Sequence, residues 1–254
     1  MSARQATLGG VVVDLVEEEE ALARFDAALR REAPPVAVES ANLDHLYWFP
    51  QGSHARHEHQ GLHWLTLMDG APLVYKARQL TGLEHARLTG ADLLGPMLDI
   101  AQRQGVSVGV FGGRYDMHQR LRPVLAERYP ALRVAGMWSP AREDLTNPTR
   151  AGKWADIVRE SGAGVVVVAL GKPRQEKWID DYGLRTGARA LLAFGAATDF
   201  LAGTSRRAPA FYQKHGLEWA YRLARDPRRL ARRYLVEGPG SLVRLLRHSD
   251  ASTP

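Results

Sequence analysis

The feature that most constrains the fold is an alternation of short apolar segments and amphipathic helical segments, which is clearest from residue 90 onward. We expect strands at residues 106–111, 132–135, 165–170 and 190–194. We expect helices at residues 91–104, 118–128 and 151–161, and in a stretch from Gln175. This alternation is typical of a parallel sheet with helices on both faces. The sequence therefore predicts an α/β fold of the Rossmann-like kind, with earlier strands at 10–16, 36–40 and 65–68 and a helix at 17–29.

The last fifty residues have a different composition. From Ser205 onward there is no strand pattern, and basic side chains lie among leucines, Trp219, Tyr221 and Tyr234. The basic residues are Arg206, Arg207, Lys214, Arg222, Arg225, Arg228, Arg229, Arg232, Arg233, Arg244 and Arg247. We therefore predict two parts: an α/β core at residues 1–204 and a basic helical C-terminal appendage at residues 205–254.

Composition narrows the cellular setting and the class of partner. The 254 residues contain no cysteine, which excludes disulfides and thiolate chemistry and fits a reducing compartment. Residues 1–7 lack the apolar stretch of a signal peptide, and the most apolar segment, 164–170, is too short to cross a bilayer. We expect a cytoplasmic protein. The net charge of +6 favours an anionic partner, whether nucleic acid, anionic lipid or a phosphorylated substrate.

Glycines follow several of the expected strands. Gly112-Gly113, Gly136, Gly171 and Gly195 are predicted at carboxyl ends, where ligands of open parallel sheets bind. Glycine lets backbone N–H groups approach a phosphate, although strand-to-helix turns also favour glycine without any ligand. Neither the dinucleotide fingerprint G-x-G-x-x-G nor the P-loop pattern is present, which disfavours dehydrogenase and NTPase functions.

Two further segments carry candidate chemistry. Asp69 follows an apolar strand and precedes Gly70, so its carboxylate is a candidate general base, with a turn-forming role as the alternative. In segment 171–178, Pro173 would fix the loop, while the side chains of Gln175 and Glu176 could bind a uracil or sugar edge, with helix capping as the alternative. The spacing of His57, His59 and His63 could suit zinc, but a polar surface loop is the favoured interpretation, so no metal is predicted.

These residues belong to a longer series of motifs that occur in a fixed order. They are Asp69-Gly70, Arg87-Leu-Thr-Gly90-Ala-Asp92-Leu93, Gly112-Gly113, Tyr129-Pro130, Gly171-Lys-Pro173-Arg-Gln175-Glu176-Lys-Trp178, Asp199-Phe-Leu-Ala-Gly203, Arg207-Ala-Pro209, Gly216-Leu-Glu218-Trp219, Arg222-Leu223 and Pro227-Arg-Arg229-Leu-Ala-Arg232-Arg233-Tyr234. In this series the chain resembles the WecG/TagA/CpsF family of glycosyltransferases, from about Asp69 almost to the end and more faintly over residues 11–29.

The resemblance implies an inverting transfer of a sugar, such as N-acetylmannosamine, its uronate or another hexose, from UDP to a polyprenyl-diphosphate-linked saccharide. It implies neither cofactor nor metal, because the UDP-sugar is a co-substrate. Asp69 then matches the candidate base, with Ser40 supplying a hydroxyl where the family usually has threonine. The substrate-binding positions implied are Asn42, Arg87, Gly90, Asp92, Gly112, Gly113, Gly136, Gly171, Pro173, Gln175, Glu176, Asp199, Arg207, Arg222, Arg229 and Arg232.

The resemblance also implies peripheral binding to the inner face of the cell membrane, with the appendage acting as a dock and an arginine-bearing lid. Basic side chains among Trp, Tyr and Leu suit an anionic leaflet. A helical pair packed on the core with a solvated basic face is the plainer alternative. We expect no nucleic-acid partner, because no groove-reading motif is present, and we allow for a homo-oligomer. Two other functions stay open: an NAD(P)-dependent oxidoreductase, and a non-enzymatic basic protein that binds membrane or nucleic acid.

Overall fold

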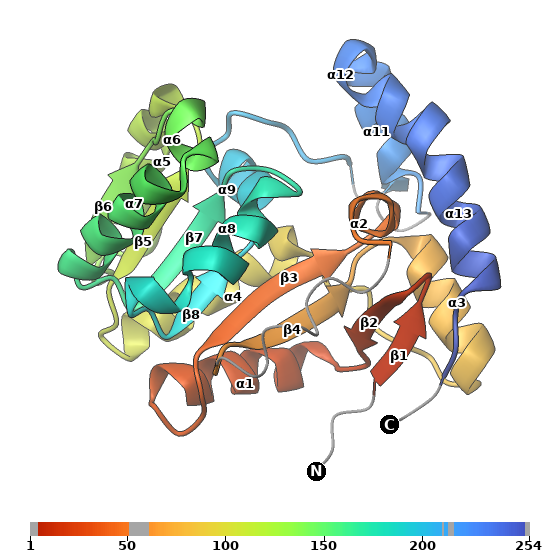
Figure 1. The fold of residues 1–254 in the computed structure, drawn as a ribbon, viewed down its shortest axis with the longest axis horizontal. Coiled ribbons are helices and arrows are strands. Elements are labelled where there is room, and N and C mark those ends of the chain that lie inside the picture. Colours follow the sequence, from red (N-terminus) through yellow and green to blue (C-terminus); the bar gives the residue numbers. More distant parts are fainter. Residues whose placement is uncertain (1–4, 51–60, 210, 213–215, 252–254) are drawn as a thin grey trace.

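The computed structural model describes residues 5–50, 61–209, 211–212 and 216–251, without the side chain of Arg229 (Figure 1). Its centre is a six-stranded sheet in the order β4-β3-β8-β7-β5-β6, in which every neighbouring pair is parallel. The strands are β3 (Val36–Ala41), β4 (His63–Met68), β5 (Val108–Gly112), β6 (Val134–Trp138), β7 (Val165–Ala169) and β8 (Ala190–Leu192). The predicted Rossmann-like α/β fold is confirmed.

Helices cover both faces of this sheet. One face carries α1 (Glu18–Leu29), α4 (Gly90–Arg103), α5 (Tyr115–Arg128) and α9 (Gly195–Leu201), and the other carries α7 (Pro148–Glu160), α8 (Arg174–Tyr182) and the short η2 (Leu184–Thr186). In β7, Val165 and Val167 join the first core cluster, whereas Val166 and Val168 join the second. A strand buried on both faces reads as a continuous apolar run, which is why residues 165–170 were recognisable from sequence.

The N-terminal region adds a second, smaller sheet. β1 (Gln5–Leu8) pairs antiparallel with β2 (Val11–Asp14), so the strand expected at residues 10–16 is shorter and lies outside the parallel sheet. Asp14 Oδ2 accepts a hydrogen bond of 2.9 Å from the backbone N–H of Thr66 in β4. Because β4 is an edge strand, this side chain satisfies an amide that no neighbouring strand reaches.

Several elements differ from the sequence-based expectation. Two helices, α2 (Leu43–Trp48) and α3 (Ala71–Thr81), were not predicted, and the six residues of α2 are too few to show a helical period. Gly195, predicted at the carboxyl end of a strand, is the first residue of α9. The strand expected at 132–135 is observed at Val134–Trp138, which places Gly136 inside β6 rather than after it.

The C-terminal segment is helical, as predicted. It contains α11 (Glu218–Arg225), α12 (Pro227–Ala231), the π-helical η3 (Arg232–Glu237) and α13 (Gly238–Arg247), which form a column beside α2 and α3 (Figure 1). Leu245 of α13 is buried in a third cluster with Leu8, Leu46 and Leu73. The appendage is therefore packed onto the rest of the protein, while the domain boundary at residue 204 stays a prediction. Within the described part of the chain, no helix has the length and apolar character needed to span a membrane.

Candidate active site

The candidate site lies at the carboxyl edge of the parallel sheet. The connection that leaves β5 leads outward to β6, whereas the one that leaves β7 leads to β8 on the opposite side. Strand order therefore reverses between β5 and β7, and ligands of open α/β sheets bind where such a reversal separates the loops. The loops after β3, β4, β7 and β8 meet along the same edge, because all of these strands are parallel.

Asp69 stands directly after β4, as predicted. Its backbone N–H donates a hydrogen bond of 2.7 Å to the carbonyl of Ala41, which fixes it beside the end of β3. Its Oδ2 accepts a hydrogen bond of 3.4 Å from Asn42 Nδ2, and its Oδ1 lies 4.0 Å from Arg87 Nη1. Asn42 is the N-cap of α2, since its Oδ1 accepts a hydrogen bond from the backbone N–H of His45. The structure therefore brings together Asp69, Asn42 and Arg87, three predicted site residues.

The environment of Asp69 suits a general base. Burial raises the pKa of its carboxyl above the ordinary value and Glu218 raises it further, while Arg87, Lys172 and Asn42 act in the opposite direction. About a quarter of the side chain, 26%, remains exposed. A carboxylate with a raised pKa is a stronger base, and this one is still accessible to a substrate hydroxyl.

The C-terminal segment reaches this site through Glu218 of α11. Its Oε2 lies 3.5 Å from Nη1 of Arg87, the same nitrogen that faces Asp69. Arg87 thus lies between a carboxylate of the core and one of the appendage. Sequence reasoning named Glu218 only as part of a motif and gave it no role, because the two residues are far apart in the chain.

Arg207 and Asp92 form a second charged pair near Arg87. Arg207 Nη2 donates a hydrogen bond of 2.8 Å to Asp92 Oδ2, and Thr89 Oγ1 donates one of 2.7 Å to the same oxygen. Although partial burial raises the pKa of Asp92, these hydrogen bonds outweigh it and hold the pKa below the ordinary value. A Cβ on the neighbouring Gly90 would lie 2.6 Å from the ring of Phe194, a residue that follows β8. Glycine at this position therefore lets the start of α4 pack closely against that ring.

The predicted glycine loops are present but differ in their use. A Cβ on Gly112 would lie 2.7 Å from backbone atoms of Ala169, so glycine lets the ends of β5 and β7 approach each other. The N–H of Gly113 donates a hydrogen bond to the carbonyl of Ala169 and is therefore engaged within the protein. Gly171 follows β7 at φ +73°, and Pro173 is the N-cap of α8.

Gly136 does not lie where the sequence predicted. It is inside β6, and a Cβ there would lie 2.3 Å from the Trp138 ring, which covers this glycine. The expectation that it ends a strand is wrong, because the strand starts two residues later than the apolar pattern indicated. β6 is also the edge strand at the opposite end of the sheet from β4 and Asp69.

The remaining predicted site residues are Asp199 in α9 and three arginines of the C-terminal helices. Asp199 in α9 accepts a hydrogen bond from Thr204 Oγ1, and the guanidinium of Arg222 lies 6.0 Å from the centroid of the Phe200 ring. Arg232 is exposed and pairs with Glu237 at 3.0 Å. Arg229 lies in α12, but its side chain falls outside the described part of the structure, as do His57 and His59 of the histidine run.

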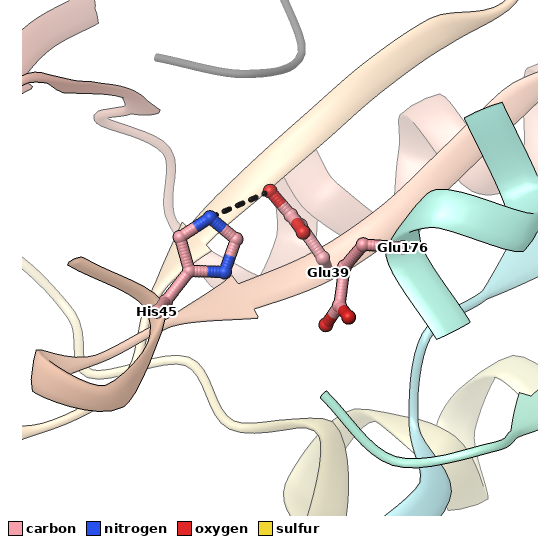
Figure 2. Close-up of side chains that lie close together, drawn as sticks. All are labelled: Glu39, His45 and Glu176. Atoms are coloured by element: carbon pink, nitrogen blue, oxygen red, sulfur yellow. Dashed lines mark ion pairs between the residues drawn. The ribbon is translucent and has the colours of Figure 1, made fainter. Parts of the chain in front are cut away.

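A buried polar cluster beneath the site was missed by sequence reasoning. It consists of Glu39, His45 and Glu176, all fully buried (Figure 2). Gln175 and Lys172 contact this cluster. Gln175 Nε2 donates hydrogen bonds to Glu176 Oε1 and to the Ala193 carbonyl, at 3.0 and 2.7 Å. Gln175 and Glu176 are thus buried and hydrogen-bonded to each other, and their predicted role in substrate binding stays a prediction. A glutamate in the middle of the apolar stretch 36–41 was the available signal.

The chain is similar in sequence to known proteins over nearly its whole length. Residues 6–252 match the model of the glycosyl transferase WecG/TagA/CpsF family. Among curated proteins, the N-acetylglucosaminyldiphosphoundecaprenol N-acetyl-beta-D-mannosaminyltransferase of Bacillus subtilis (strain 168) is 27% identical over 166 residues. The match covers 65% of this chain and 62% of that relative, so it spans less than two thirds of the relative's length. Because the family match covers nearly the whole chain, this protein belongs to the WecG/TagA/CpsF family of glycosyltransferases.

Proposed function

We propose that this protein is an inverting glycosyltransferase that moves a sugar from UDP to a polyprenyl-diphosphate-linked saccharide in the synthesis of a cell-surface polymer. The observation that carries the proposal is the partly exposed Asp69 carboxylate at the end of β4, next to Arg87. A base and a fixed cation at one strand edge are what an attacking hydroxyl and a departing diphosphate require.

The name of the Bacillus subtilis relative supports the substrate classes. It describes transfer of N-acetylmannosamine to a diphosphoundecaprenol-linked N-acetylglucosamine. We extend to this chain the lipid-diphosphate acceptor and a UDP-sugar donor of the N-acetylmannosamine type, its uronate or another hexose. The proposed enzyme uses no cofactor and no metal, since carboxylate and guanidinium groups carry the chemistry.

The reaction then follows from the groups present. Asp69 removes the proton of the acceptor hydroxyl as its oxygen attacks the anomeric carbon from the face opposite UDP. The new glycosidic bond forms while the bond to the diphosphate oxygen breaks, and its electron pair leaves with UDP. Arg87 offsets the charge on the departing diphosphate, because a guanidinium holds phosphate oxygens in a bidentate manner. In this proposal Arg222, Arg229 and Arg232 supply further cations from the appendage.

The donor pocket is proposed along the same edge. Ser40, Asn42, Gly90, Asp92, Asp199 and Arg207 remain the candidate contacts, together with the loops at Gly112, Gly113, Gly171 and Pro173. Glu176 and Gln175 are proposed to support the pocket from below, because their side chains are buried and bonded to each other.

The appendage is proposed to bind the inner face of the cell membrane, where a polyprenyl substrate resides. Leu235 and Val236 in η3 are 59% and 70% exposed, and Leu246 of α13 is also exposed. Arg228 and Arg232 lie nearby in the chain and are exposed as well. Apolar side chains flanked by cations suit an anionic leaflet better than nucleic acid. A homo-oligomer that forms or dissociates on docking remains part of the proposal.

The decisive experiment is a transfer assay on vesicles that contain a polyprenyl-diphosphate-linked N-acetylglucosamine acceptor, with a panel of UDP-sugars. Formation of a disaccharide-lipid that Asp69→Asn abolishes would support the proposal. Titration calorimetry with UDP, ADP and NAD provides a separate readout. Selective binding of NAD together with no transfer would favour the oxidoreductase alternative and overturn the proposal.

A further inference from the structure

Lys172, in the loop after β7, has an unusual environment for a lysine. Only 13% of its side chain is exposed, and its Nζ lies among three acceptors from three different elements. Nζ is 3.0 Å from the Ser40 carbonyl of β3, 3.1 Å from His45 Nδ1 of α2 and 3.7 Å from Glu176 Oε1 of α8. Two of the three ammonium donors make hydrogen bonds, to the Ser40 carbonyl and to His45 Nδ1, while Glu176 Oε1 lies at ion-pair distance.

This arrangement sets the protonation of His45. Because an ammonium has no acceptor, the Nδ1 of His45 must accept, and the ring proton of the neutral imidazole is then on Nε2. Nε2 lies 3.5 Å from Glu39 Oε1, the contact marked by the dashed line in Figure 2. Glu39 Oε1 also accepts a hydrogen bond of 3.0 Å from Thr66 Oγ1. A continuous polar chain therefore runs from Lys172 through His45 to Glu39 inside the protein.

The cluster already contains its own cation. A histidine and two carboxylates whose ligand atoms lie within 4.8 Å of one another resemble a set of metal ligands. However, the Lys172 ammonium is in contact with two of the three groups. The pKa of Glu176 is raised by burial and by Glu39, and lowered by Lys172. Within the described residues its Oε2 is buried and has no hydrogen-bond partner.

The same lysine is linked to the candidate base. Ser40, whose carbonyl it binds, is two residues before Asn42, and His45 donates its backbone N–H to Asn42 Oδ1. Asn42 in turn donates a hydrogen bond to Asp69. Lys172 therefore holds both sides of the turn between β3 and α2 that presents Asn42 to Asp69.

We propose that Lys172 is a positioning residue for Asp69, which fixes the Asn42 turn and keeps the Asp69 carboxylate ionised at the site. This inference rests on the proposed function, in which Asp69 is the general base. The charged groups that face Asp69 are Arg87 from the segment before α4, Arg207 from the segment after α9, Glu218 from α11 and Lys172. Arg87 also pairs with Glu218, Arg207 with Asp92 and Lys172 with Glu176.

The test uses a variant that removes the ammonium without leaving an extra buried negative charge. Glu39→Gln is the reference background, and Glu39→Gln/Lys172→Met also removes the cation, so that the buried net charge stays that of the wild type. Lys177→Met removes an exposed lysine from the same helix region and is the matched control. Lys172→Arg keeps the charge and serves as the conservative variant. The readout is the pH dependence of kcat/KM, whose acid limb reports the base of the free enzyme.

We expect the acid limb of the double variant to lie at higher pH than that of Glu39→Gln, because the Lys172 cation lowers the pKa of the Asp69 carboxyl and its removal raises that pKa. A nearby cation favours the ionised form of a carboxyl group. When the Lys172 ammonium is removed, Asp69 therefore takes up its proton at higher pH, and the acid limb moves to higher pH. Lys177→Met should leave the limb in place, and Lys172→Arg should keep it near the wild-type position. Equal acid limbs in Glu39→Gln and the double variant of an active enzyme would overturn the proposal.

A second readout separates this inference from the proposed function. Carboxyl carbon NMR, with the Asp69 signal assigned by its loss in Asp69→Asn, measures the titration of Asp69 in proteins that need not turn over. A higher midpoint in the double variant supports the inference even if no sugar transfer is found, and an unchanged midpoint overturns it. Metal analysis of the purified wild type tests the rival interpretation, in which Glu39, His45 and Glu176 bind a metal ion. One bound zinc that is lost in His45→Ala would also overturn the proposed role of Lys172.

Discussion

Glu218 of α11 lies 3.5 Å from Arg87, and this ion pair joins the C-terminal helices to the candidate base. The same Arg87 nitrogen is 4.0 Å from Asp69. In the proposed donor complex, a diphosphate on Arg87 would compete with Glu218 for the same guanidinium.

We expect Arg87→Ala to weaken UDP binding by about 10- to 100-fold, since hydrogen bonds to charged groups contribute about 1.5–3 kcal/mol. Glu218→Gln should strengthen UDP binding, because it removes a competing carboxylate from the same guanidinium. Titration calorimetry measures both affinities. Arg78→Ala, which removes an exposed arginine paired with Glu84, is the matched control and should bind UDP like the wild type. Equal affinity in Arg87→Ala would exclude Arg87 from the donor site.

Asp69→Asn should lower kcat by about 10²- to 10⁴-fold, the contribution of a positioned general base. Its stability at neutral pH should not fall. Burial raises the folded-state pKa of Asp69 above 3.8, so the stability that this group contributes is present at low pH and is lost as pH rises through the folded pKa. Asparagine does not ionise, so the Asp69→Asn variant does not lose this stability as the pH rises. Urea unfolding at pH 7 measures it, and a clearly destabilised variant would show that Asp69 has a structural role instead.

The Asp92–Arg207 pair should contribute about 1 kcal/mol of coupling, at the upper end for a pair that is partly exposed to solvent. The double-mutant cycle uses Asp92→Asn and Arg207→Gln. Because the folded pKa of Asp92 lies below 3.8, its contribution is present above the unfolded pKa and is lost as pH falls through the folded pKa. The coupling should therefore persist at pH 7 and disappear in strongly acidic solution. Unfolding curves at both pH values test this, and a coupling that is independent of pH would contradict it.

Replacing Leu235 and Val236 together by Ser should reduce binding to anionic vesicles by at least about tenfold, because burying each side chain contributes about 1.5–3 kcal/mol. Co-sedimentation with vesicles measures the binding. The matched control replaces Ile157 and Leu184, two exposed apolar residues of α7 and η2, by Ser. If the control loses binding and the η3 variant does not, the membrane contacts a different face from the one proposed.

Gly112→Ala should destabilise the protein by about 1–3 kcal/mol more than Gly105→Ala. Both glycines have positive φ, of +95° and +64°, so both substitutions strain the backbone. Only at Gly112 would the new Cβ also meet the Ala169 backbone, at 2.7 Å, whereas nothing lies within 4 Å of the Cβ at Gly105. Urea unfolding at pH 7 measures the difference. Equal losses would mean that β5 and β7 can separate at no cost.

β7 was recognised from sequence to within one residue. It is buried on both faces, so every residue in it is apolar and the pattern needs no knowledge of neighbouring strands. α2 was missed because its six residues include His45, Tyr47 and Trp48, and its start depends on the Asn42 cap. Gly136 was misplaced because the boundary of β6 is set by pairing with β5, which local composition does not report.

Asp69, Asn42 and Arg87 were named from the sequence, yet their meeting depends on the order of the strands and the return of the chain before α4. Sequence alone predicts the alternation of strands and helices, the family motifs and the basic character of the last fifty residues, because these are properties of neighbouring residues. The contacts of Glu218 with Arg87 and of Lys172 with Ser40 and His45 depend on the folded arrangement. The two contacts of Lys172 join residues that are 132 and 127 positions apart in the sequence. They form only when β3 and β7 both pair with β8, because this pairing places the loops after the two strands close together.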